Sequence, residues 1–509
     1  RDPDIGSEPT SMRITVTLWA LLGVCLLSGC GGDVESYDLI IRNGTVYDGL
    51  GGAPVVTDVG INGDRVTAIG DLEGAETRRE IDASGLAVAP GFINMLSWAT
   101  VSLIEDGRAM SDIMQGVTLE VMGEGSSMGP LNETMRAEAE ERMGDIRFDV
   151  EWTTLDEYLR FLENEGISLN VASYVGATTV RIHELGYEDR PPDAAELQRM
   201  QELVREAMAD GALGVGSSLI YAPAAYADTD ELIALVSAAA EFGGAYISHL
   251  RSEGDRLEEA VQEIIKIASL TGAPAEIYHL KASGRENWDK LERVFNLIEA
   301  AQAAGIRLSA DMYTYRAGLT GLDATMPPWV QEGGHAAWVE RLQDPDIRAQ
   351  VAGEMRSAGT DWENFFVHAG PEGILLSGFR NPELRHLIGK TLAEVAAERG
   401  TDPAETAMDL VVEDDSRVDA VFFLMSENNV RKKVAKNWIS FGSDAGALAT
   451  EGVFLEANPH PRAYGTFARV LGRFSRDEGI VELSDAIRRM TSLPAANIGI
   501  RERGRLEAG

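Results

Sequence analysis

The sequence predicts an α/β fold, a (β/α)8 TIM-like barrel preceded by a small β-sandwich-type domain. Short apolar strands alternate with amphipathic helices from residue 91 onward, and residues 37–90 contain β-branched runs separated by turns. One strand-end motif also recurs after about one strand–helix–strand step. With 509 residues, 44% of them hydrophobic, the chain can bury a core of this size.

Residues 12–30 resemble a bacterial lipoprotein signal peptide. A basic start precedes an apolar run over 14–27, which is too short to span a bilayer, and small residues lead to Cys30. We expect cleavage before Cys30 and lipidation of its sulfur; an uncleaved N-terminal anchor is the alternative. The prediction is a protein of the bacterial cell envelope that faces the periplasm and contacts the membrane only through a lipid anchor.

Composition excludes several classes of function. Cys25 and Cys30 are the only cysteines, so the cleaved, lipidated protein has no disulfide, no cysteine nucleophile and no cysteine metal site. The 82 acidic residues outnumber the 45 basic ones, giving a net charge of −37, which argues against a nucleic-acid partner. The charge suits a soluble surface, and any bound anion then needs a local cluster of cations.

Residues 31–36 form a short polar tether, and two domains follow it. In the small β domain, 37–90, Asn-Gly turns separate the strands. In the barrel, 91–500, the candidate strands are 91–96, 117–122, 169–175, 213–217, 245–249, 275–279, 307–311 and 437–442. A helix is expected over 194–209, with Asp193 and Glu196 placed as a capping box.

A long insertion separates the last two barrel strands, over about 320–430. It contains a possible additional strand at 420–425. A segment of this length near the barrel mouth predicts either a lid or a fixed structural cover.

Two histidines carry the strongest chemical pattern. The stretches 247–251 and 277–281 share one motif, an apolar strand that ends in His249 or His279 with a basic residue two positions later. Strand ends of a barrel meet at one mouth, where active sites form. We therefore expect the two imidazoles to lie together and ligate a metal, although a single strand-end histidine is usually structural.

Two carboxylates also follow barrel strands. Glu124 lies between two glycines after the second strand, where a metal ligand or a solvated loop acid would fit. Asp444 follows the last strand, where a general base or a helix N-cap would fit. Glu124, His249 and His279 would form a two-histidine, one-carboxylate set of the kind used by catalytic zinc.

The chain from residue 37 onward resembles a known family. The stretches that carry the resemblance are 88–93, 115–118, 211–214 with 219–223, the two histidine strands, 311–315, 442–444 and 460–467. Together they are similar to the amidohydrolase superfamily and, within it, to the N-acyl-D-amino-acid deacylases. The resemblance implies that His249 and His279 bind zinc and that Asp444 transfers the proton. It also implies a substrate surrounded by cationic and aromatic groups, namely Lys281, Tyr221, Tyr313 and Arg462.

The sequence departs from the family at the metal site. The family's first barrel strand ends in a His-x-His pair of ligands, whereas the matching stretch here has Leu96 and Trp98. The deacylases place a cysteine ligand where this chain has Gly125, one position after Glu124. We therefore expect one tightly bound zinc ion. An indole filling the pocket, or imidazoles that point apart, would exclude such a site.

The family resemblance also concerns the end of the chain. Family members continue beyond the stretch 501–509 with strands that complete the small domain, so we expect those strands to be missing and an edge of the sheet to be unpaired. Among the remaining histidines, His368 is expected to be packed structurally, and His460 is a neighbour of Arg462 that lines the site.

These residues predict a metal-dependent hydrolase of non-peptide amide bonds in N-acyl amino acids, with Asp444 as general acid and base. The family resemblance implies that these amino acids have the D configuration. One alternative is a cyclic-amide or dipeptide hydrolase of the same superfamily. Another is a non-catalytic binding lipoprotein that has lost part of its metal site. The acyl group, the side-chain preference and the oligomeric state stay open.

Overall fold

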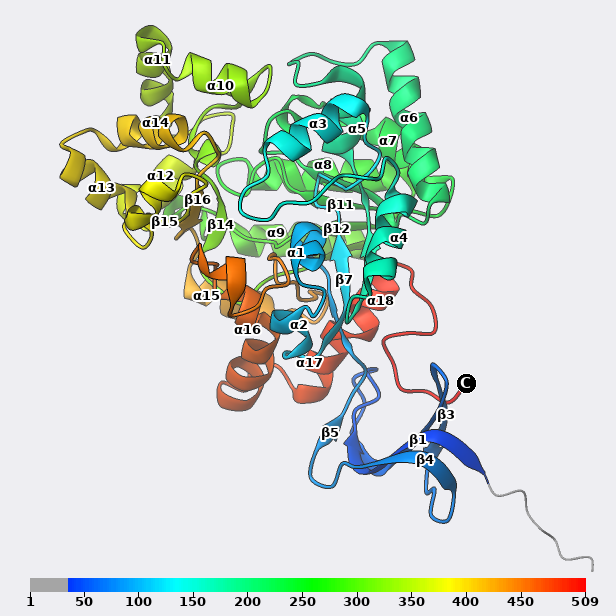
Figure 1. The fold of residues 1–509 in the computed structure, drawn as a ribbon. Helices are drawn as coiled ribbons and strands as arrows, with labels where there is room; N and C mark the ends of the chain where they lie inside the picture. The colour runs from blue at the N-terminus through cyan, green and yellow to red at the C-terminus, as the bar shows by residue number, and fades with distance from the viewer. Residues whose placement is uncertain (1–34) are drawn as a thin grey trace, which may run out of the picture.

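The computed structural model describes residues 35–509, so the predicted signal peptide and lipidation site lie outside the described residues. Within that range, no helix combines the length and apolar character needed to cross a bilayer. The two predicted parts are distinct, with the small β domain lying beside one end of a larger barrel (Figure 1).

The small domain is a five-stranded sheet. The strands have the order β3-β2-β1-β4, and β5 also pairs with β1. Their bounds are β1 Ser36–Val46, β2 Val55–Asn62, β3 Arg65–Gly70, β4 Glu76–Asp82 and β5 Ala87–Val88. The end of the chain returns to this sheet, since Leu506 N–H donates to the Asp48 carbonyl and Gly509 N–H to that of Val66, both at 2.9 Å.

The barrel confirms the predicted fold class, because eight parallel segments follow one another around it. Seven are built from named strands, with bounds β6 Phe92–Asn94, β7 Val117–Met122, β8 Asn170–Ser173 continued by β9 Val175–Gly176, β10 Gly214–Ser218, β11 Ala245–His249, β12 Ala275–Ile277 and β13 Leu308–Ala310. Each pairs in parallel with the next in sequence within the two sheets β6-β7-β8 and β9-β10-β11-β12-β13.

The eighth segment, 439–445, closes the barrel without forming a regular strand. Ser440 N–H donates to the Ala310 carbonyl at 2.9 Å on one side. On the other side, Asp444 N–H donates to the Leu96 carbonyl at 2.9 Å. This segment therefore lies between the seventh and first strands and brings the residues after it to the barrel mouth.

The surrounding helices cover the barrel with their apolar faces. They are α1 Ala99–Glu105, α2 Met110–Ile113, α3 Glu133–Glu141, α4 Leu155–Glu165, α5 Ala177–Leu185, α6 Ala194–Ala209, α7 Thr229–Ala240, α8 Leu257–Thr271, α9 Lys290–Ala303, α15 Glu427–Val434, α16 Arg462–Arg469, α17 Leu483–Met490 and α18 Ser492–Asn497. The predicted capping box at α6 is present, with Asp193 and Glu196 each accepting from the other's backbone. Met200 and Val204 of this helix are fully buried, as its periodicity requires.

The insertion forms a subdomain with its own hydrophobic core. Its antiparallel sheet has the order β14-β16-β15, and the predicted additional strand is β16. The elements are β14 Gly318–Gly321, α10 His335–Arg341, α11 Pro345–Met355, α12 Phe365–Ala369, β15 Ile374–Gly378, α13 Leu392–Arg399, α14 Pro403–Asp414 and β16 Asp419–Phe422. It supplies part of the wall of the main cavity, which agrees with a cover over the barrel mouth.

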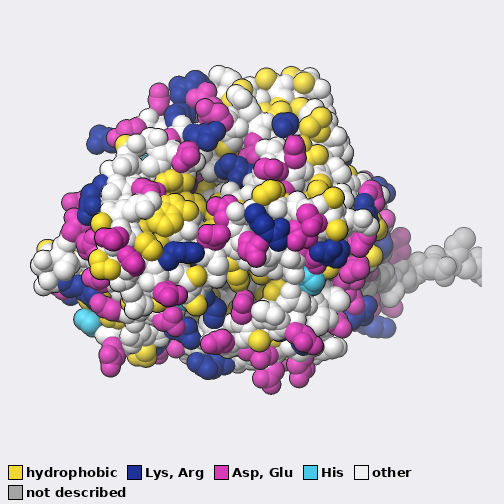
Figure 2. Space-filling view, turned by 90° about the horizontal axis from the view of Figure 1, so that it is seen from above, with side chains coloured by type: hydrophobic (Ala, Val, Ile, Leu, Met, Phe, Trp, Pro, Cys, Tyr) yellow, Lys and Arg dark blue, Asp and Glu magenta, His cyan; other side chains and the backbone are white. Residues whose placement is uncertain are grey.

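The charge of −37 is spread over the surface. On the face seen from above, acidic and basic side chains are interspersed with hydrophobic ones (Figure 2).

Candidate metal centre

Two glycines aim Glu124 into the barrel mouth. Gly123 and Gly125 have φ values of 103° and 72°, which disfavour side chains. A Cβ on Gly123 would lie 2.4 Å from the Tyr174 carbonyl oxygen, and one on Gly125 would lie 2.7 Å from the Ser218 side chain. The chain therefore bends sharply after β7, and Glu124 is 3% exposed.

The histidines come from neighbouring strands. His249 is the last residue of β11, whereas His279 lies two residues beyond β12 with a φ of 35°. Asp311 fixes this backbone, since its Oδ1 accepts from His279 N–H at 2.9 Å. Both imidazoles are nearly inaccessible, so their positions are set by the barrel.

The structure brings Glu124, His249 and His279 together. Glu124 Oε1 lies 3.1 Å from His249 Nδ1 and 3.0 Å from His279 Nε2. One ligand atom from each residue lies within 4.8 Å of the other two, and the imidazole centroids are 4.5 Å apart. Two imidazole nitrogens and one carboxylate oxygen are a donor set that suits catalytic zinc, so these residues fit the ion.

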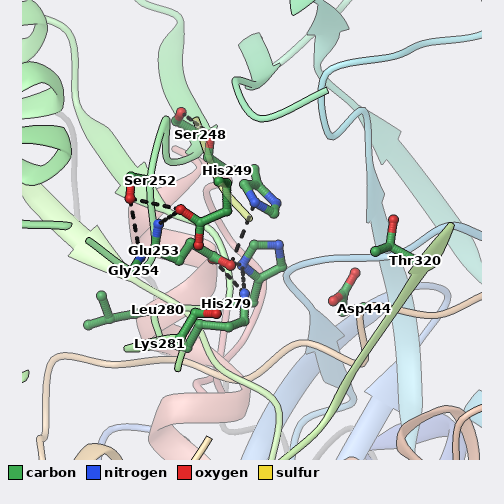
Figure 3. Close-up of polar contacts among 12 residues, drawn as sticks. Ser248, His249, Ser252, Glu253, Gly254, His279, Leu280, Lys281, Thr320 and Asp444 are labelled. Carbon is green, nitrogen blue, oxygen red and sulfur yellow. Dashed lines mark hydrogen bonds and ion pairs between the residues drawn. The ribbon is translucent and has the colours of Figure 1, made fainter. Parts of the chain in front are cut away.

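A second carboxylate, Glu253, lies close to both imidazoles (Figure 3), beside the ring nitrogens that do not face Glu124. Its Oε1 lies 3.1 Å from His279 Nδ1, and its Oε2 lies 3.6 Å from His249 Nε2. Glu253 Oε2 and His249 Nε2 have no hydrogen-bond partner among the described residues. A carboxylate beside the outer nitrogens of metal-ligating histidines fixes their tautomer and orientation. Sequence reasoning missed Glu253, because it follows β11 in an irregular loop.

Charge balance keeps these acids ionised. Burial would raise the pKa of Glu124, but His279 and His249 outweigh it and hold that pKa below its usual value. Burial would also raise the pKa of Glu253. The charge of Lys281, whose Nζ lies 2.5 Å from Glu253 Oε1, outweighs burial and lowers this pKa below its usual value. Ionised carboxylates are the form that ligates or orients a metal site.

Asp444 lies across the mouth from Glu253, with a φ of 52°. Its Oδ2 accepts from Arg462 Nη1 at 2.5 Å, and its Oδ1 accepts from Trp98 Nε1 at 3.2 Å. The same indole nitrogen donates to Glu124 Oε2 at 3.0 Å. Burial raises the pKa of Asp444 although Arg462 opposes this shift, which suits a group that takes up and releases a proton.

A cavity of about 570 Å³ opens above these groups. Trp98 forms part of its wall and is 41% exposed, so the indole borders the space instead of filling it. The imidazoles face each other and Glu124, so neither condition that would exclude a metal is met.

The four predicted substrate-binding residues all line this cavity. The cations are already paired, Lys281 with Glu253 and Arg462 with Asp444. Tyr221 donates its hydroxyl to Thr320 Oγ1 at 2.9 Å, while the Tyr313 hydroxyl has no partner among the described residues.

Arg417 is a cavity-lining cation that sequence reasoning missed. Its guanidinium lies 5.0 Å from the Tyr221 ring centroid and 2.9 Å from Asp323. It comes from the insertion, just before β16, and no local pattern marks that position. His460 also lines the cavity, whereas His368 lies outside the lining and contacts the Ser283 hydroxyl at 3.1 Å.

A parallel barrel that gathers two imidazoles, one carboxylate and a separate buried acid at its mouth defines the class of metal-dependent amidohydrolases. No family model matches the chain. It is 34% identical to a D-aminoacylase of Alcaligenes xylosoxydans xylosoxydans over 481 residues, which cover 94% of this chain and 87% of the relative.

Two solved structures agree. An N-acyl-D-glutamate deacylase from Bordetella bronchiseptica, complexed with zinc and a phosphonate mimic of the tetrahedral intermediate, is 29% identical with a TM-score of 0.76. A D-aminoacylase studied for its binuclear metal centre, with one-metal activation and second-metal attenuation, is 32% identical with a TM-score of 0.75. Each alignment covers 93% of this chain and 88% of the other. The chain belongs to the D-aminoacylase family of amidohydrolases.

Proposed function

We propose that this protein is a zinc-dependent deacylase of N-acyl-D-amino acids. The observation that carries the proposal is the convergence of Glu124, His249 and His279 beside Asp444, at the floor of a cavity of about 570 Å³. The D configuration rests on the relatives, which are a D-aminoacylase and an N-acyl-D-glutamate deacylase.

Glu124, His249 and His279 would hold the ion. Bound zinc polarises an amide carbonyl and makes water more acidic. Asp444 then takes the proton of the attacking water and delivers it to the nitrogen of the departing amine. Arg462 holds the Asp444 carboxylate at 2.5 Å and thereby fixes the direction from which the proton is taken.

The charge of the site favours an anionic substrate. Glu124, Glu253 and Asp444 contribute three negative charges, and Lys281 and Arg462 contribute two positive ones. With both imidazoles neutral, as metal ligation requires, these five groups sum to one negative charge without the ion and to one positive charge with one divalent ion. Metal loading thus provides the attraction that the carboxylate of an N-acyl amino acid needs on this acidic protein.

The experiment measures zinc content and hydrolysis together. We expect one zinc ion per chain and faster release of acetate from N-acetyl-D-amino acids than from their L enantiomers. The Glu124→Ala variant should lose both metal and rate, while the exposed Glu133→Ala control keeps them. Failure of zinc-loaded protein to hydrolyse either series would contradict the proposal. Opening of hydantoin rings instead would indicate a cyclic-amide hydrolase.

We also propose that the protein is tethered to the bacterial cell envelope through a lipid on Cys30. The apolar run over 14–27 and the small residues before Cys30 support this. The full chain expressed in a bacterium should partition with membranes and carry acyl groups by mass spectrometry. A Cys30→Ser variant should lose the acyl groups, and an unmodified wild-type Cys30 would contradict the proposal.

A further inference from the structure

Trp98 occupies a specific electrostatic position in the centre. Its indole nitrogen donates to Glu124 Oε2 at 3.0 Å and to Asp444 Oδ1 at 3.2 Å, so one N–H lies between two buried carboxylates. The carboxylates themselves are ionised or ionisable groups on different strands, and their facing oxygens repel each other unless positive charge lies between them.

The barrel closure fixes this indole. Trp98 N–H donates to the Ala445 carbonyl at 3.0 Å, and Ser97 forms a parallel bridge with Ala445. Helix α1 begins at the next residue, so the backbone of Trp98 is held on both sides. The indole is therefore placed by the contact between the first and eighth barrel segments.

An indole N–H can satisfy carboxylate oxygens but cannot ligate a metal, because the lone pair of its nitrogen is delocalised into the aromatic ring and the group only donates. A cation placed between Glu124 Oε2 and Asp444 Oδ1 would have to displace it. The remaining oxygens point elsewhere, Glu124 Oε1 to the two imidazoles and Asp444 Oδ2 to Arg462. Of the two carboxylates, only Glu124 therefore has an oxygen free of the indole that faces other metal ligands, namely Oε1 beside the two imidazoles.

We propose that Trp98 is a positioning residue that stands in for a second cation. Its N–H links Glu124 to Asp444, restricts the centre to one zinc ion and orients Asp444 for proton transfer. This inference rests on the proposed function. It distinguishes the chain from the D-aminoacylase with a binuclear centre, where a second metal attenuates activity.

The primary test counts zinc per chain by equilibrium dialysis over rising free zinc. Wild type should reach one ion and stay there, and its hydrolysis rate should not fall as zinc is added. Trp98→His, which supplies a ligand nitrogen between the two carboxylates, should bind a second ion. Trp329→Phe serves as the control, because that indole also donates to a carboxylate, Glu354 at 3.1 Å, but lies outside the cavity lining.

The positioning role is tested by Trp98→Phe, which keeps an aromatic ring and removes the N–H. With one zinc bound, kcat should fall by about tenfold or more, as for a lost hydrogen bond to a charged group, while KM stays within about threefold. Wild-type protein provides a second readout that needs no folded variant. The Trp98 indole resonance in a ¹⁵N spectrum should lie downfield and remain there when zinc is added.

Two zinc ions bound to wild type, or an indole resonance that moves to the position of a free indole on zinc loading, would overturn the inference. An unchanged kcat in a folded Trp98→Phe variant would also overturn it. Metal stoichiometry is independent of turnover. If wild-type protein binds one zinc ion but hydrolyses no N-acyl amino acid, the proposed function is wrong. If wild-type protein is active and binds two zinc ions, only the role of Trp98 is wrong.

Discussion

In the proposed mechanism, Asp444 is the side chain that transfers the proton. Both of its carboxylate oxygens accept a hydrogen bond, one from Arg462 and one from Trp98, so an amide of the same shape keeps one of these two contacts and removes the proton acceptor. The Asp444→Asn variant is expected to lose about 10²–10⁴-fold in kcat, the range for removal of a general acid–base. Its zinc content, measured by atomic emission, should equal that of wild type; a loss of zinc would show that Asp444 supports the metal.

Arg462 sets the pH at which Asp444 becomes active. Burial raises the pKa of Asp444, and the Arg462 guanidinium works against that rise. Removing the cation in Arg462→Gln should raise the pKa further, so Asp444 loses its proton only at higher pH. The acidic limb of the kcat/KM profile is therefore expected to move to higher pH. An Arg476→Gln control, whose guanidinium pairs only with Asp477 at the surface, should leave the limb in place.

At the scale of elements, the insertion is joined to the barrel through Glu363, just before α12. Its Oε2 accepts from the Ser252 hydroxyl at 2.8 Å and from Glu253 N–H at 3.2 Å. Burial, followed by the charge of Glu253, raises the pKa of Glu363 to about 8. The folded protein therefore holds a proton here at neutral pH that the unfolded chain releases.

This proton predicts a pH-dependent stability. Between the ordinary carboxyl pKa of 4.5 and about 8, the folded state binds one more proton at Glu363 than the unfolded state. The free energy of unfolding should then fall with rising pH by up to about 1.4 kcal/mol per unit. Glu363→Gln should reduce this slope, as measured by denaturant unfolding at pH 5, 6.5 and 8. Equal slopes for the two proteins would contradict the assignment.

Sequence patterns within a few residues predicted the features that depend only on neighbouring residues in the chain. The barrel strands are apolar runs, the repeated motif around His249 and His279 placed both imidazoles, and the glycines beside Glu124 marked a loop that points into the mouth. The contacts of Trp98 and Glu253 were not predictable, since they depend on side chains up to 346 residues apart in the chain. Strand β16 was predicted as an additional strand, but its pairing with β14 was not, because the two are not successive strands.

At the scale of the whole molecule, zinc should act as a stabilising ligand. An ion that binds only the folded state stabilises that state by about 2.7 kcal/mol at 100 times its Kd. We expect the melting temperature to rise on addition of zinc and to fall with a chelator, as followed by calorimetry. Glu124→Ala should show no such response, and a response equal to that of wild type would place the ion elsewhere.

The left-handed backbone at His279 and Asp444 lowers the stability of the fold at two residues of the proposed site. Such conformations cost roughly 1–3 kcal/mol for residues with a Cβ, and here they occur at a proposed zinc ligand and at the proposed general acid and base. A laboratory selection for heat tolerance alone would therefore favour glycine at position 444 and drift toward a sturdier, inert barrel. Screens for a hardier catalyst must retain turnover as a criterion in every round.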